Sequence, residues 1–202
     1  LSEFLFGFDG ERIEITNRYA PPSLEHPFGT DELGRDLFIR LSYGGQVSLA
    51  VGLVAALFSS IIGTVIGLIA GYLGGRTDSF LMRFTDGVIS LPLLPLLIVL
   101  VAIDLKKMGL PEELADSENM ALYRIIIVIA LFGWTTVARL VRAETLSLKN
   151  QQFVRAAEAL GTSTAHIIMR HILPNSISPI TVATTLSIGN IILMESVLSF
   201  LG

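Results

Sequence analysis

Four side chains near the start of the chain have the chemistry of metal ligands: His26, Asp31, Glu32 and Asp36. Imidazole nitrogens and carboxylate oxygens suit several divalent cations. The carboxylates also precede an apolar helical stripe of Leu33, Leu37, Phe38 and Leu41. Capping and the helix dipole favour acidic side chains at such a place. We therefore expect a helix capped by Thr30 or Asp31, lying at the membrane interface, and no metal site.

A second chemical candidate is Glu195, a carboxylate close to the end of a long apolar stretch. An ionisable group at membrane depth often marks a functional site, although one at a helix end can also reach water or headgroups. Together with Pro92 and Pro95 of an earlier apolar stretch, Glu195 is a candidate for gating or cargo contact. The apolar stretches hold no pair of His, Asp, Glu or Ser at catalytic spacing, so no catalytic residue is predicted.

The segment from 150 to 174 has the pattern of a docking surface. Asn150 can cap a helix, and Gly161 can end it in the left-handed conformation. One face of this helix is apolar and shallow, which favours docking in a groove of another protein. That face carries Phe153, Ala156, Ala157 and Leu160. A second helix is expected from Thr162 or Ser163 to Pro174, where the proline bends the chain.

Composition places these segments in a membrane protein. Hydrophobic residues make up 51% of the 202 residues, charged residues make up 16%, and the mean hydropathy is +0.67. A helix of about 20 apolar residues crosses the hydrocarbon core. The predicted spans are 46–75, 87–103, 122–141 and 176–199. In the last of these, Ser178 is a plausible cap and Pro179 a plausible first helical residue.

Charge in the loops sets the predicted orientation, because Lys and Arg favour the cytoplasmic side. The loop from 139 to 171 is basic and is placed inside, whereas the acidic loop from 104 to 124 is placed outside. Alternation then puts residues 76–86 inside, as a surface loop with Asp78, Arg83 and Asp86, and residues 1–45 outside. This orientation explains the basic loop without nucleic acid.

Small residues recur at every fourth position along the first predicted span. They are Ala55, Ser59, Gly63, Gly67, Gly71 and Gly75. Such spacing lines one helical face with side chains that let another helix approach closely. Ser59, Gly63, Gly67 and Gly71 are therefore predicted to be helix-packing residues.

The two ends suggest a piece of a longer protein. The chain begins without Met on the predicted outer side, and it stops on an apolar run. We expect a fragment that lacks one span before Leu1 and one after Gly202.

Several segments together resemble one transporter family. Ala156-Ala157 and Gly161, followed at the proper interval by Leu173-Pro174, resemble the cytoplasmic EAA loop of the membrane subunits of ATP-binding-cassette (ABC) importers. Further motifs resemble the dipeptide/oligopeptide/nickel branch: GTDELGRD at 29–36, YGGQVSLAVG at 43–52, RLVRAETLSLKNQQFVRAAEALG at 139–161 and RHILPN at 170–175. One departure is Arg155, which stands where the loop usually has Glu, with Glu158 following.

The resemblance implies an all-α, polytopic membrane fold of the type I ABC importer transmembrane domain for residues 46–202, with a coupling loop at 142–174. It implies a permease subunit that moves di- or oligopeptides in the plasma membrane of a prokaryote, the inner membrane in a Gram-negative cell. The implied ATPase-coupling residues are Phe153, Arg155, Ala156, Ala157, Glu158, Leu160, Gly161 and Pro174.

The implied partners are a second permease subunit in a heterodimer, two cytoplasmic ATPase subunits and an extracytoplasmic solute-binding protein. ATP and Mg would bind to the ATPase subunits, because this chain has no Gly-Lys pair of a phosphate-binding loop. The alternatives are import of nickel or another small solute, a gradient-driven secondary transporter that uses Glu195, and, last, a membrane-embedded enzyme.

Overall fold

The structure is a computed structural model that describes residues 13–92, 95–96, 99 and 118–201. The chain divides into two compact units, Leu1–Ala50 and Val51–Gly202. Helix α2 (Leu37–Leu73) begins in the first unit and continues into the second. The described part of the second unit consists of helices and their connections, which agrees with the predicted all-α class.

In the first unit, a hydrogen-bonded loop with the short 3-10 helix η1 (Ile15–Asn17) leads into α2. The N-cap of α2 is Asp36, whose Oδ1 accepts hydrogen bonds from the backbone N–H groups of Phe38 at 2.8 Å and Ile39 at 3.0 Å. The predicted cap at Thr30 or Asp31 is wrong. The helix cannot start that early because Gly34 has a φ of 75°, outside the right-handed helical region.

Three of the four candidate metal ligands, His26, Asp31 and Asp36, make hydrogen bonds within this loop instead. His26 Nδ1 lies 2.8 Å from Asp36 Oδ2. Asp31 closes a turn by accepting hydrogen bonds from the backbone N–H groups of Leu33 and Arg35. Burial opposes ionisation of Asp31, but these bonds and the Arg35 guanidinium outweigh it and lower its pKa to about 2. Among the described residues, no group of three or more His, Asp or Glu is placed to hold a metal ion.

Helix α2 replaces two predicted elements with one. The expected interfacial helix before residue 45 is the first part of the same continuous helix that was predicted to cross the membrane from 46 to 75. The helix ends at Leu73 because Gly74 and Gly75 take φ values of 66° and 55° and turn the backbone. The chain then enters α3 (Gly75–Ser90), so residues 76–86 are helical and the predicted loop there is wrong.

Helix α3 also corrects the second predicted span. It ends at Ser90, and Leu91 is extended with a ψ of 136°, as expected for a residue that precedes a proline. The predicted span from 87 to 103 therefore does not begin as a new helix at Gly87. Most of its remaining length lies outside the described residues.

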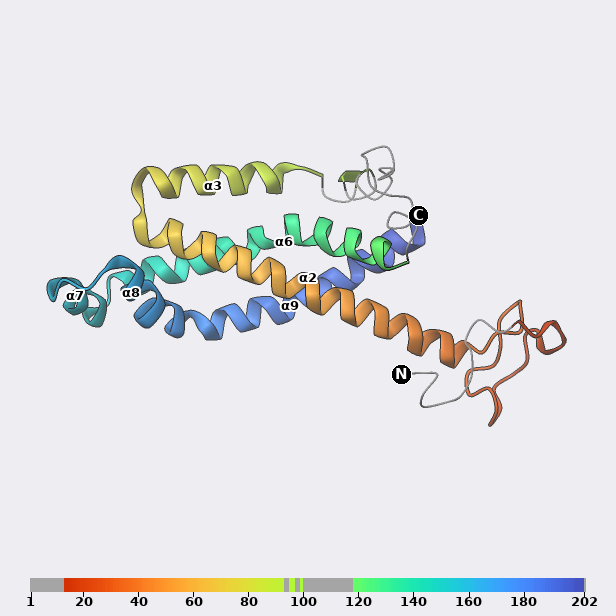
Figure 1. Cartoon of the computed structure of the whole chain (residues 1–202). Coiled ribbons are helices and arrows are strands. Elements are labelled where there is room, and N and C mark those ends of the chain that lie inside the picture. Colours follow the sequence, from red (N-terminus) through yellow and green to blue (C-terminus); the bar gives the residue numbers. More distant parts are fainter. Residues whose placement is uncertain (1–12, 93–94, 97–98, 100–117, 202) are drawn as a thin grey trace. The chain divides into compact units, whose positions relative to one another are not determined.

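The rest of the second unit is built on two long helices and the short elements between them. They are α6 (Glu118–Lys149), α7 (Gln152–Ala159), α8 (Thr164–Ile167), the π-helix η3 (Ile168–Ile172) and α9 (Leu173–Leu201). Figure 1 shows α7 and α8 gathered at the end of α6 and the beginning of α9. Helix α6 extends beyond the predicted span of 122–141 at both ends. Helix α9 begins before the predicted cap at Ser178, and Pro179 lies inside it.

Three helical stretches of the described chain are long and apolar enough to cross a membrane: Leu37–Leu73, Ile126–Lys149 and Thr164–Val197. The chain is thus a multi-pass membrane protein.

The small-residue stripe of α2 packs against the backbone of α6. A Cβ added to Gly67 would lie 2.6 Å from the carbonyl oxygen of Ala138 and 2.7 Å from Val141 Cβ. Gly63 and Gly71 have equally close neighbours on α6, and Ser59 is buried beside Gly133. The structure therefore shows the close helix approach that this spacing predicts. Gly75 is not part of this contact, because its added Cβ would meet open space.

Candidate functional site

Helix α7 has one side buried in the second unit. Val154 is fully buried, and Ala157 is 8% exposed. Both belong to a cluster that joins four neighbouring elements, with Leu68 and Tyr72 from α2, Val137 and Val141 from α6, Ile167 from α8 and Ile172 from η3. This burial fixes the orientation of α7 on the ends of the long helices. The position of Ala157 corrects the prediction that it shares the docking face.

The face of α7 adjacent to this buried side is apolar and exposed. Phe153 is 42% exposed, Leu160 is 86% exposed, and Ala156 lies between them on the same side. The Phe153 ring also lies near the His171 imidazole, with ring centroids 6.3 Å apart. Large exposed apolar side chains at a helical spacing form a surface that another protein can cover.

The end of α7 has the hydrogen-bond pattern of a Schellman motif. Gly161 has a φ of 78°, and its N–H donates to the carbonyl oxygen of Glu158 at 2.9 Å. The N–H of Thr162 donates to the carbonyl oxygen of Ala157 at 3.1 Å. The left-handed stop predicted at Gly161 is confirmed, and these bonds satisfy carbonyls that the helix end would leave unpaired.

The start of α7 differs from the prediction. Gln151, not Asn150, occupies the N-cap, and no side chain there bonds to the helix backbone. Asn150 instead directs its side-chain Nδ2 to the carbonyl oxygen of Leu146 at 3.0 Å, in the last turns of α6. The short connection from α6 explains this, because Asn150 still belongs to the end of the preceding helix.

The two charged residues of α7 differ in their contacts. Arg155 is exposed, and its Nη2 lies 3.5 Å from Asn150 Oδ1. Glu158 accepts a hydrogen bond from the hydroxyl of Tyr72 on α2, at 2.9 Å. Glu158, the carboxylate that follows Arg155 in the sequence, is therefore hydrogen-bonded to another residue of this chain.

Pro174 does not bend the chain away from a separate last span. Helical structure continues from Thr164 through η3 into α9, and Pro174 lies in the first turn of α9. The π-helical turn explains this, because the N–H of Leu173 bonds to the carbonyl oxygen of Ile168. A π-type turn widens the helix and leaves room for the proline ring.

Two acidic side chains of α3 pair with arginines of α6. Arg142 holds Asp78 through Nε at 2.5 Å and Nη2 at 2.6 Å, whereas Arg139 Nη2 lies 2.5 Å from Asp86 Oδ1. The hydrogen bond from Arg142 lowers the pKa of Asp78 below its ordinary value of 3.8, against the opposing effect of burial. Asp78 and Asp86 thus connect α3 to α6. Asp78 is largely buried, which differs from its prediction as a surface residue, whereas Asp86 remains exposed.

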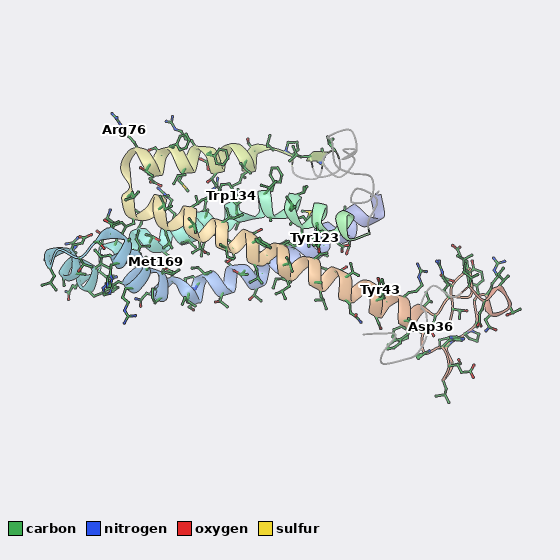
Figure 2. The ribbon with its side chains drawn as sticks, viewed as in Figure 1. Asp36, Tyr43, Arg76, Tyr123, Trp134 and Met169 are labelled. Carbon is green, nitrogen blue, oxygen red and sulfur yellow. The ribbon has the colours of Figure 1, made fainter. Side chains whose placement is uncertain are left out.

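Aromatic packing adds to the contact between α3 and α6. Trp134, labelled in Figure 2, stacks on Phe84 with ring centroids 6.0 Å apart and ring planes 15° apart.

Replacing Asp78 by Asn is expected to lower the free energy of unfolding by about 1.5–3 kcal/mol, the range for hydrogen bonds to charged groups. Since the pKa of folded Asp78 lies below 3.8, its contribution is complete above that pH and is lost as the pH falls through the lower folded value. Thermal unfolding of the full-length protein in detergent should therefore show a steeper loss of stability below about pH 4 in the wild type than in the variant.

The matched control for this prediction is Asp86→Asn, because it removes the other ion pair between the same helices. That pair is open to solvent, with side chains 60% and 50% exposed, against 17% and 32% for Asp78 and Arg142. The control should cost about 0–1 kcal/mol. Equal losses of unfolding free energy in the two variants would contradict the view that the Asp78–Arg142 pair stabilises the contact between α3 and α6 more than the Asp86–Arg139 pair does.

A cavity of about 540 Å³ lies between α3, α6 and α9. Most of its wall is apolar, and its polar side chains are Thr135, Thr136, Arg139, Ser187 and Asn190. Sequence reasoning did not single out these residues as a cavity wall. The polar side chains inside predicted spans, Asn190 above all, are the signal that could have indicated one.

Two of the predicted gating candidates, Pro92 and Glu195, are chain neighbours of cavity residues without being among the wall residues themselves. Leu91, which precedes Pro92, and Met194, which precedes Glu195, line it. Glu195 is buried, with 8% of the residue exposed. This burial differs from the expectation that a carboxylate at a helix end reaches headgroups or water. Pro92 follows the end of α3, and its carbonyl oxygen accepts a hydrogen bond from the N–H of Leu96 at 3.2 Å.

Comparison with known proteins gives a family for most of the chain. Residues 63–202 match the family described as binding-protein-dependent transport system inner membrane component. The chain is 38% identical over 195 residues to the oligopeptide transport system permease protein OppC of Bacillus subtilis (strain 168), covering 96% of this chain and 59% of the relative.

Two further relatives are similar. The dipeptide transport system permease protein DppC of the same strain is 40% identical over 202 residues, covering 100% of this chain and 59% of the relative. The oligopeptide transport system permease protein OppC of Escherichia coli (strain K12) is 44% identical over 185 residues, covering 91% and 57%. The chain thus spans somewhat more than half the length of these curated relatives.

Proposed function

Since the chain belongs to the family of binding-protein-dependent transport system inner membrane components, we propose that it is a transmembrane permease subunit of an ATP-driven importer. The proposed cargo is a di- or oligopeptide, supported by the names of the relatives, which are oligopeptide and dipeptide transport permeases. The proposed location is the plasma membrane of a prokaryote, which is the inner membrane in a Gram-negative cell.

The proposed partners are a second permease subunit in a heterodimer, two cytoplasmic ATPase subunits and an extracytoplasmic solute-binding protein. ATP and Mg would bind to the ATPase subunits. The names of the family and its relatives, which describe a binding-protein-dependent transport system and a permease component of it, support the binding protein and the multi-subunit character of this arrangement.

The observation that carries the proposal is the two-sided construction of α7. Its inner side, with Val154 and Ala157, is buried against the ends of α2, α6 and η3. Its outer side exposes Phe153 and Leu160. A helix held on one side and bare on the other can dock in a cleft of an ATPase subunit and pass that subunit's motion to the long helices.

Replacing Leu160 by Asp tests the docking. The variant places a charge where the proposed contact needs an apolar side chain, and Leu160 is 86% exposed, so folding of this chain should be little affected. We expect the affinity of the full-length protein for the ATPase subunits of its system to fall at least about tenfold, since an anchor residue contributes about 1.4 kcal/mol or more. Co-purification and titration with labelled ATPase subunits measure it.

Leu24→Asp is the matched control, because Leu24 is likewise a highly exposed leucine but lies in the segment predicted to be extracytoplasmic. Wild-type affinity in both variants would count against α7 as the docking helix. Uptake of nickel instead of peptides by the assembled system would correct the cargo and leave the docking intact. Uptake that needs only an ion gradient would replace the proposal by the secondary transporter.

A further inference from the structure

Tyr72 stands where three helices of the second unit meet. It lies next to the last residue of α2 and is 7% exposed. Its hydroxyl donates to Glu158 Oε1 of α7 at 2.9 Å, and its carbonyl oxygen accepts a hydrogen bond from Lys149 Nζ of α6 at 2.5 Å. The same Nζ lies 5.2 Å from the centroid of the Tyr72 ring.

The polar contacts of Tyr72 with Glu158 and Lys149 both involve a charged group. A hydroxyl that donates to a carboxylate forms a charge-assisted hydrogen bond, which is stronger than a neutral one. The Lys149 ammonium lies at the carboxyl end of α2, where the helix dipole favours a cation, and close to the ring, which attracts a cation. Tyr72 also belongs to the apolar cluster that holds Val154 and Ala157. The contact between α2 and α7 is therefore both packed and polar.

Besides the short chain connection to α6, α7 is connected to α9 through a longer segment. It passes along the chain through Gly161, where an added Cβ would find no heavy atom within 4 Å, and then through α8 and η3 to α9. That path runs through several residues outside α7. The hydrogen bond between Tyr72 and Glu158 joins two helices directly, because Tyr72 lies within α2 and Glu158 within α7.

We propose that Tyr72 is a positioning residue, which holds α7 to the end of α2 through Glu158 so that movement of α7 reaches α2 directly. The proposal rests on the proposed function and adds a route to it. It also gives Glu158 a role inside this chain, as the acceptor for Tyr72, in place of a role as an ion-pair partner of the ATPase.

The test uses the complete transporter in lipid vesicles and compares ATP hydrolysis with and without loaded binding protein. Tyr72→Phe removes the hydroxyl and keeps the ring. We expect the stimulation of ATP hydrolysis to fall about tenfold, while the complex stays assembled with an ATPase affinity near that of the wild type. Glu158→Ala should give the same loss, and Glu158→Gln should recover part of the stimulation, because its amide oxygen still accepts the hydroxyl proton. The double variant Tyr72→Phe/Glu158→Ala should be no worse than either single variant.

Tyr43→Phe is the matched control, since it removes the hydroxyl of an exposed tyrosine in the first turns of the same helix. Full stimulation in Tyr72→Phe would overturn the proposal, as would additive losses in the double variant. A loss that is explained by dissociation of the ATPase would also overturn it, because Tyr72 would then be merely structural. If loaded binding protein does not stimulate ATP hydrolysis by the wild-type transporter, the proposed function is wrong. If it stimulates the wild type and the Tyr72→Phe variant equally, only the inference about Tyr72 is wrong.

Discussion

Replacing Gly67 by Leu is expected to separate α2 from α6 and to destabilise the protein strongly. Even a Cβ at this position would lie 2.6 Å from the Ala138 carbonyl oxygen and 2.9 Å from the Arg142 backbone nitrogen. Backbone atoms cannot move aside as a flexible side chain can, so the helices themselves must shift. We expect a loss of about 3 kcal/mol or more, at or above the upper end of the usual range for overpacking.

The measurement is thermal unfolding of the full-length protein in detergent, followed by far-ultraviolet circular dichroism. Gly189→Leu is the matched control, because Gly189 is also a glycine within a long helix and its added Cβ would meet nothing within 4 Å. Similar melting temperatures for the two variants would show that the small-residue stripe is not a close helix contact.

Replacing Gly161 by Pro is expected to abolish stimulation of ATP hydrolysis by loaded binding protein. Proline fixes φ near −65°, whereas Gly161 has a φ of 78°. Proline also removes the N–H that donates to the Glu158 carbonyl oxygen at 2.9 Å. The end of α7 and the path into α8 must then change, at a cost of about 3 kcal/mol or more if the rest of the loop keeps its structure.

Gly161→Asn separates the backbone effect from the loss of glycine itself. Asparagine tolerates the left-handed region, and the space around Gly161 is open, so its side chain has room. We expect Gly161→Asn to retain most of the stimulation in lipid vesicles. Full stimulation in Gly161→Pro, with the complex assembled, would remove the end of α7 from the coupling path.

The sequence predicts those features of this molecule that depend on local pattern. The recurrence of Ser59, Gly63, Gly67 and Gly71 indicates a close helix contact, because small residues on one face have few other uses in a membrane helix. Gly161 is identified as a helix stop for a similar reason, since few other residues adopt its backbone conformation without strain. In each case one structural requirement, a close helix contact or a left-handed backbone conformation, can be met by only a few residue types.

Helix ends were less predictable, because they depend on competing local interactions. Asp31 and Asp36 are both good caps, and the positive φ of Gly34 decides between them in favour of Asp36. Pro174 and Pro179 would ordinarily begin or break a helix. In the structure, the π-helical turn before Pro174 leaves room for that proline, and α9 also continues through Pro179. No residue type indicates such a turn in advance.

Contacts between distant parts of the chain lay beyond sequence reasoning. Tyr72 and Glu158 are 86 positions apart, and Asp78 and Arg142 are 64 positions apart. No local sequence pattern marks these side chains as partners, because only the packing of α2, α3 and α7 against α6 brings them together. The burial of Ala157 could not be predicted either, because the sequence of α7 does not indicate which of its apolar residues pack against the neighbouring helices.

The most direct test of the central claim is peptide uptake by vesicles that contain the complete transporter. ATP is supplied on the cytoplasmic side, and labelled oligopeptide with its binding protein is supplied on the other side. The account predicts that uptake requires ATP hydrolysis, persists when ion gradients are dissipated, and is lost with Leu160→Asp. Uptake that continues without ATPase subunits and stops when the gradients are dissipated would contradict it.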